Sequence, residues 1–226
     1  MTISARIPAK AATVLATALA LACSAAAVAD TDTGGTAYDQ EAAATAKAQR
    51  HAMLGTPVRF RGDARPGSKV AVQLLDDGRW TTVATAVADA KGRYVARWRS
   101  EHIGVFSLRS VPAGSASVRA SSVTQPVQVT VYKPAVATWY GKGWYGRKTA
   151  CGYTLSPQLM GVAHKTLPCG TKVSFLYHGR SITVPVIDRG PYGAGISWDL
   201  TTAAADALGF LAAGKDTLGA VSLRRR

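Results

Sequence analysis

The chain has 226 residues, of which 27 are basic and 13 acidic, giving a formal net charge of +14 at neutral pH. This length leaves room for one or two domains that each bury a core. The basic balance favours an anionic partner such as a cell-wall polymer or an acidic glycan, with nucleic acid as the generic alternative. Because the basic residues are scattered along the sequence, the charge is also consistent with a role in solubility alone.

Residues 1–29 are predicted to be an export signal. Arg6 and Lys10 form a positive n-region, residues 11–22 form an apolar run, and residues 27–29 (Ala-Val-Ala) provide a cleavage site. The run is too short to span a bilayer comfortably. Lipid attachment at Cys23 is an alternative, but the residues before it fit a lipoprotein signal poorly. We therefore expect a secreted or cell-wall-associated protein with no transmembrane segment in its mature chain, and export argues against a nucleic-acid partner.

Residues 30–54 are predicted to be a linker or a short helix. The Ala, Glu, Gln, Lys and Arg content of residues 39–53 favours a helix, with Asp39 as a candidate N-cap and Gly55 as a stop. The apolar face of such a helix is mostly alanine and buries little surface. A helix and a disordered spacer therefore fit this segment equally well.

Residues 55–133 contain short alternating runs separated by turn signals such as Arg65-Pro66-Gly67 and Asp76-Asp77-Gly78. Strands at this spacing predict a small Ig-like β-sandwich, which we interpret as a spacer or a wall-binding module. Lys133-Pro134 is predicted to mark the boundary, because proline ends a strand. The expected strands cover residues 58–60, 69–75, 80–87, 92–98, 104–108 and 127–132.

Residues 135–226 are again rich in predicted strands, at 137–140, 172–176, 181–187 and 219–223. One short helix is expected from an N-cap at Thr201 or Thr202 to Gly209. So many strands with one helix favour a small closed barrel. Cys151 and Cys169 most simply form one disulfide in an exported protein. Metal-ligand spacing is absent, so neither a metal nor another cofactor is predicted.

Few residues in this part of the chain could act as carboxylate acids or bases in catalysis, because residues 134–226 contain no glutamate and four aspartates. Asp206 and Asp216 are expected to face solvent. Asp188 ends an apolar strand, where burial is expected to raise its pKa towards that of a general acid. Asp199 precedes a helix N-terminus, which favours the ionised form. The structural alternatives are that Asp188 pairs with Arg189 or holds a turn, and that Asp199 caps the helix.

His164 lies between the two cysteines, so a disulfide would restrain its position. Its imidazole is a candidate to bind substrate or to orient an aspartate, and a purely structural role is the alternative. Several aromatic residues lie near glycines and turns, a pattern suited to stacking on sugar rings, although about half of them are expected to pack the core. The candidate substrate-binding residues are Trp139, Tyr140, Tyr153, Arg189, Tyr192 and Trp198.

Several motifs appear in order along this part of the chain: residues 138–141 (Thr-Trp-Tyr-Gly), 149–152 (Thr-Ala-Cys-Gly), 163–168 (Ala-His-Lys-Thr-Leu-Pro), 188–192 (Asp-Arg-Gly-Pro-Tyr) and 199–201 (Asp-Leu-Thr). Together they resemble the double-psi β-barrel of the rare lipoprotein A (RlpA) family, which is related to expansins and family-45 endoglucanases. The resemblance covers essentially all of residues 135–226.

The resemblance implies a six-stranded barrel with a groove across it and peptidoglycan as the substrate. In the lytic transglycosylases of this family, the residue corresponding to Asp188 is expected to be essential, with His164 supporting it. An acid protonates the bond between N-acetylmuramic acid and N-acetylglucosamine, and the 6-hydroxyl of the sugar then closes a 1,6-anhydro ring. In the expansin and endoglucanase relatives the key acid corresponds to Asp199. The resemblance therefore does not decide whether Asp188 or Asp199 donates the proton.

One position departs from the family pattern. Transglycosylase members usually carry a glutamate where this chain has Tyr153. A tyrosine is a poor anion near neutral pH, since its usual pKa is about 10. The alternative function is therefore a non-catalytic, expansin-like protein that binds or loosens wall polysaccharide. Glycan length, stem-peptide preference, another β-linked polysaccharide as substrate and the oligomeric state are left open by the sequence.

Overall fold

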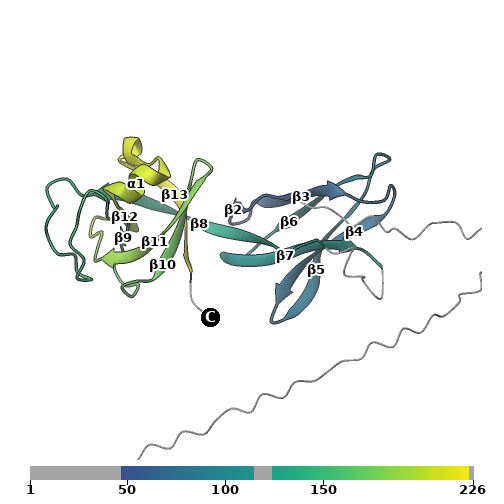
Figure 1. The fold of residues 1–226 in the computed structure, drawn as a ribbon, viewed down its shortest axis with the longest axis horizontal. Helices are drawn as coiled ribbons and strands as arrows, with labels where there is room; N and C mark the ends of the chain where they lie inside the picture. The colour runs from purple at the N-terminus through teal and green to yellow at the C-terminus, as the bar shows by residue number, and fades with distance from the viewer. Residues whose placement is uncertain (1–46, 115–123, 224–226) are drawn as a thin grey trace, which may run out of the picture. The chain divides into compact units, whose positions relative to one another are not determined.

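The computed structural model describes residues 47–114 and 124–223 and is built almost entirely of β-strands (Figure 1). The predicted export signal and the first part of the 39–53 segment lie outside the described residues. None of the described helices has the length and apolar character needed to cross a membrane.

The N-terminal part is a two-sheet β-sandwich, as predicted. Strands β1, β3 and β6 form one sheet, and β2, β5, β4, β7 and the first half of β8 form the other. Alternation places one face of each strand in the core, and β6 buries Tyr94, Ala96 and Trp98 while four other side chains face outward. The strand bounds are β1 Lys47–Ala48, β2 His51–Met53, β3 Pro57–Asp63, β4 Lys69–Asp76, β5 Arg79–Val87, β6 Arg93–Arg99, β7 Gly104–Pro112 and β8 Val127–Tyr140.

The helix expected over residues 39–53 is wrong for residues 47–53, which form β1 and β2. β1 pairs with β3, and β2 pairs in parallel with β8. Ala52, counted in the sequence as part of a weak helical face, is instead 3% exposed in the sandwich core. Strand pairing and burial therefore outweigh the helix propensity of alanine here.

Pro134 does not end a strand, because β8 runs without interruption from the sandwich into the second group of strands. The pairing of β8 with β7 stops at Val131 and its pairing with β2 stops at Tyr132. In the described chain, Pro134 is paired on one side only, with Gly219 of strand β13 (Lys215–Leu223). A proline lacks an N–H donor, and a position with one free side tolerates that loss.

The C-terminal part is a closed barrel of six strands, in which β8 pairs with β13, β13 with β10, β10 with β11, β11 with β9, β9 with β12 and β12 with β8. The added bounds are β9 Val162–Ala163, β10 Lys172–Tyr177, β11 Arg180–Asp188, β12 Trp198–Thr201 and β13 Lys215–Leu223. Helix α1, Thr202–Leu208, is capped by Thr201 and ends at the left-handed Gly209, as predicted. A 3₁₀ turn follows at Leu211–Ala213. The core contains Phe175, Val184, Leu200, Leu208 and Phe210.

Candidate active site on the barrel

A β-bulge at the end of β11 sets the direction of Asp188. Val186 pairs with Val162 of β9, but Asp188 pairs with the next residue, Ala163, so Ile187 is the extra residue. Without the bulge, Asp188 would share the core-facing side of Val186. The inserted Ile187 is fully buried and packs so closely on Gly161 that a Cβ there would overlap its side chain. The bulge therefore turns the carboxylate of Asp188 out of the core.

Asp199 reaches the same face by ordinary alternation along β12. Its neighbours Trp198 and Leu200 point into the barrel core. Asp199 pairs on one side with Ala163 and on the other with Thr138 of β8. Residues directly opposite one another on neighbouring strands share a face. One row therefore runs across four strands through Asp188, Ala163, Asp199 and Thr138.

This row lies in a cleft of about 730 Å³. Two strand spacings, about 10 Å, separate the backbones of Asp188 and Asp199. Only the methyl group of Ala163 rises between them, so the sheet leaves space above that residue for a ligand. Among the described residues, no cluster of three or more histidine, cysteine, aspartate or glutamate side chains is placed to hold a metal ion.

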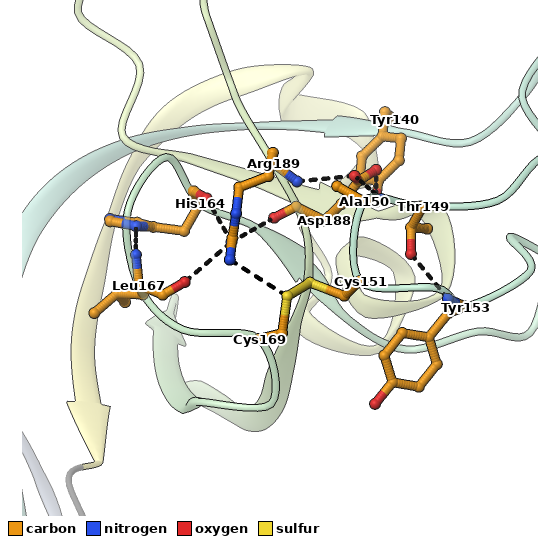
Figure 2. Close-up of a disulfide and its surroundings, with 10 residues drawn as sticks. All are labelled: Tyr140, Thr149, Ala150, Cys151, Tyr153, His164, Leu167, Cys169, Asp188 and Arg189. Carbon is orange, nitrogen blue, oxygen red and sulfur yellow. Dashed lines mark hydrogen bonds between the residues drawn. A yellow bond between two sulfur atoms is a disulfide. The ribbon is translucent and has the colours of Figure 1, made fainter.

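Three hydrogen-bond donors hold the carboxylate of Asp188 (Figure 2). Its Oδ1 accepts from the backbone N–H groups of Ala150 and Arg189, each at 2.8 Å. Its Oδ2 accepts from the hydroxyl of Tyr140 at 3.2 Å. Burial, followed by the charge of Asp188, raises the pKa of Tyr140, so the phenol stays protonated and donates. All three partners are donors, the bonding pattern of an ionised carboxylate.

The environment of Asp199 is different, because it is half-buried and its described hydrogen bond comes from the hydroxyl of Thr138 at 2.7 Å. Burial raises the pKa of Asp199, the Thr138 hydrogen bond opposes this, and the negative charge of Asp188 raises it further. The expectation that a helix N-terminus favours the ionised form of Asp199 is therefore wrong in direction, because the pKa of Asp199 is raised. Helix α1 begins at Thr202, and Thr201 rather than Asp199 caps it.

The side chain of His164 lies away from the two carboxylates, because it follows Ala163 and points to the opposite side of β9. Its ring packs 4.4 Å from that of Trp198, and its Nδ1 accepts the backbone N–H groups of Thr166 and Leu167. In Figure 2 the ring and the Asp188 carboxylate point apart. His164 contacts Asp188 through its backbone, whose N–H donates to the Asp188 carbonyl at 3.2 Å.

Arg189 and the disulfide hold the loops that flank Asp188. The guanidinium donates to the carbonyl oxygens of His164 and Leu167 and to the Sγ of Cys169, although Arg189 also lines the cleft. The predicted disulfide between Cys151 and Cys169 is confirmed, with a Cα–Cα distance of 5.8 Å. It connects this loop with the segment whose Ala150 amide binds Asp188 (Figure 2).

The predicted sugar-binding aromatics divide between cleft and core. Tyr140 and the exposed Tyr192 line the cleft. Trp198 is 8% exposed in the barrel core, and Trp139 packs against that core while its indole N–H donates to the Leu211 carbonyl. Tyr153 is exposed outside the cleft lining, on a turn where its backbone N–H donates to the hydroxyl of Thr149.

Other residues of the cleft were not chosen from the sequence. Trp144 is 54% exposed, and the guanidinium of Arg147 lies 4.9 Å from the centre of its ring. Lys148 lines the same edge. The available signal was the glycine-rich segment at residues 141–148, where two aromatics and two cations (Trp144, Tyr145, Arg147 and Lys148) fall within five positions. Thr138 and Thr149 also line the cleft, and short hydroxyl side chains leave no comparable pattern.

The fold and site define a class: a double-psi β-barrel with two carboxylates of unlike environment in one surface cleft. Residues 134–218 match a family model described as lytic transglycolase. This domain belongs to the RlpA-like double-psi β-barrel family.

The chain is similar to a probable endolytic peptidoglycan transglycosylase RlpA of Synechocystis, with 35% identity over 49% of this chain and 35% of the relative. An endolytic peptidoglycan transglycosylase RlpA of Campylobacter jejuni is 41% identical over 39% of this chain and 34% of the relative. The matched region therefore spans about a third of each relative. Among solved structures, a Streptomyces papain inhibitor is 29% identical over 39% of this chain and 91% of its own length, with a TM-score of 0.33.

Proposed function

We propose that the barrel is a lytic transglycosylase that cleaves the bond between N-acetylmuramic acid and N-acetylglucosamine in peptidoglycan and leaves 1,6-anhydro ends. The observation that carries this proposal is the row in which Asp188 and Asp199 flank Ala163 within one cleft. The family of the domain and the printed names of its relatives support the substrate. Glycosidic cleavage commonly uses two carboxylates whose environments differ.

We assign the proton donor to Asp199, because burial and the neighbouring Asp188 raise its pKa. As the glycosidic bond breaks, its oxygen takes the proton of Asp199. The 6-hydroxyl of the muramic acid residue attacks the anomeric carbon and passes its proton to Asp188. Asp188 also stabilises the positive charge that develops at the anomeric carbon. Proton transfer from Asp188 back to Asp199 completes the cycle.

The edge of the cleft provides groups suited to an anionic glycan. Trp144 and Tyr192 expose flat rings on which sugars can stack. Arg147 and Lys148 are cations at the same cleft, and peptidoglycan carries carboxylates on its stem peptides. A protein with this activity must act outside the cytoplasmic membrane, in agreement with the export signal predicted at residues 1–29.

The test is digestion of purified sacculi, with mass analysis of the soluble fragments. Wild-type protein should release anhydro-muropeptides, and Asp199→Asn should lower the rate by about 10²–10⁴-fold, the range for loss of a general acid. Asp188→Asn should be similarly impaired. Asp206→Asn is the matched control, because this exposed aspartate on α1 lies outside the cleft. The wild-type rate should fall as pH rises through the pKa of Asp199, since only the protonated acid donates.

The presence of Tyr153 in place of the usual family glutamate favours one alternative function, that of a wall-binding protein. A binding protein without cleavage activity would sediment with sacculi through Trp144 and Tyr192 but release no anhydro ends. That result for the wild-type protein would replace the transglycosylase proposal. Full activity of Asp199→Asn would instead refute the assignment of the acid.

A further inference from the structure

The outer face of the β1–β3–β6 sheet gathers cations from segments far apart in the sequence. Its exposed basic residues are Lys47, Arg59, Arg61, Arg93, Arg97 and Arg99. Arg93 forms an ion pair with Asp89, and we call the other five residues the cationic face. Lys47 lies directly opposite Arg61, and Arg59 lies directly opposite Arg97. Basic residues that look scattered in the sequence are therefore clustered on the folded sandwich.

This arrangement has a cost for folding, because like charges directly opposite on paired strands destabilise a sheet. Within the described part of the chain, none of the five residues forms a salt bridge with a carboxylate; the ion pair found there joins Asp89 to Arg93, which lies at the end of the same outer face of β6. Asp63 and Glu101 are the acids closest along these strands, and each lies near an end of the face. The repulsion is therefore concentrated at the centre of the sheet.

Edge protection does not account for the pattern. Charged residues on edge strands prevent unwanted pairing with other sheets. Arg59 and Arg61, however, lie on β3, the central strand of this sheet. Solubility alone does not require this clustering, because cations spread over the whole surface would have the same effect. Such a distribution would avoid placing Arg59 opposite Arg97 and Lys47 opposite Arg61.

We propose that the cationic face binds an extended, phosphodiester-linked polymer of the cell wall. Four of its five cations are arginines, whose planar guanidinium groups bind phosphate oxygens in pairs. Side chains on one face of a strand recur about every 6.8 Å, and neighbouring strands lie about 4.8 Å apart, so the face presents a regular grid of charge. The half-exposed Val95 between the cations gives the polymer backbone an apolar contact. The choice of a wall polymer over other polyanions rests on the proposed action of the barrel on peptidoglycan.

The test compares wall fragments that retain their phosphate-linked polymer with fragments from which acid has removed it, using sedimentation at several salt concentrations. The variant Arg59→Gln/Arg61→Gln/Arg97→Gln removes three exposed charges. Arg65→Gln/Arg79→Gln/Lys91→Gln is the matched control, because it removes three exposed charges elsewhere on the sandwich. Three lost phosphate contacts should reduce the salt slope of log K by about two to three and weaken binding at low salt by at least tenfold.

The expected result is that the first variant loses retention on phosphate-bearing walls, while the control and the cleavage of stripped sacculi are unchanged. Wild-type retention by the first variant would overturn the proposal, as would equal retention of the wild-type protein on stripped walls. Tighter binding to duplex DNA or to anionic phospholipid vesicles than to phosphate-bearing walls would also overturn it. Failure of the barrel proposal would appear separately, as the absence of anhydro products from stripped sacculi.

Discussion

Removal of the disulfide should weaken both the fold and the position of Asp188. The double variant Cys151→Ser/Cys169→Ser opens a covalent loop between cysteines 18 residues apart. On the chain-entropy model, a loop of this size contributes about 3 kcal/mol to the free energy of unfolding at 25 °C. If the barrel unfolds as its own unit of about 90 residues, this loss corresponds to a decrease in Tm of roughly 12–24 °C.

Denaturant unfolding followed by tryptophan fluorescence would measure this free energy. Wild-type protein whose disulfide has been reduced should give the same value as the double variant. The disulfide also restrains the segment whose Ala150 amide binds Asp188. We therefore expect the rate of sacculus cleavage per folded molecule to fall as well. A change of less than about 1 kcal/mol, together with unchanged cleavage, would refute the role assigned to this cross-link.

Two further predictions concern titrating residues. Because burial, and then the charge of Asp188, raise the pKa of Asp199, the folded state binds this proton more tightly than the unfolded chain. Stability then falls as pH rises towards that pKa, so Asp199→Asn should increase the free energy of unfolding at neutral pH while lowering the rate of cleavage by about 10²–10⁴-fold. An unchanged or lower free energy of unfolding would contradict this. Burial, followed by the charges of Arg189 and Lys165, lowers the pKa of His164, so stability should fall as pH decreases through about 6.5. His164→Ala should lower the free energy of unfolding by about 1–3 kcal/mol through two lost amide contacts, and a fully stable variant without cleavage would instead assign His164 a catalytic role.

The sequence predicted the sheet-rich fold because alternating apolar residues define most of the strands. β10 and β11 match the expected runs to within a residue or two. Two short strands, β9 and β12, were missed, because two to four residues cannot display a period. These two strands carry Ala163 and Asp199, so the row that joins Asp188 to Asp199 was not predictable from the pattern of apolar residues alone.

The candidate acids were predicted, but not their environments. Asp188 was expected to be the buried acid because an apolar run precedes it. The bulge at Ile187 instead carries Asp188 out of the core to three hydrogen-bond donors, and only the register with β9 reveals it. Asp199 seemed to be at a helix N-terminus, but its position within β12 determines its burial. Proton affinity depends on such tertiary contacts rather than on neighbours in the sequence.

At both proposed sites, the sheet brings side chains of like charge close together. Asp199 is half-buried beside the like charge of Asp188, and Arg59 is paired directly opposite Arg97. Neither arrangement stabilises the folded protein, and each is supported by a sheet that is well packed on its other face. When residues that destabilise a fold are found in a sheet that is otherwise well packed, they indicate selection for something other than stability. In the barrel, burial and then the charge of Asp188 raise the pKa of Asp199, and on the sandwich a bound polyanion would offset the repulsion between Arg59 and Arg97.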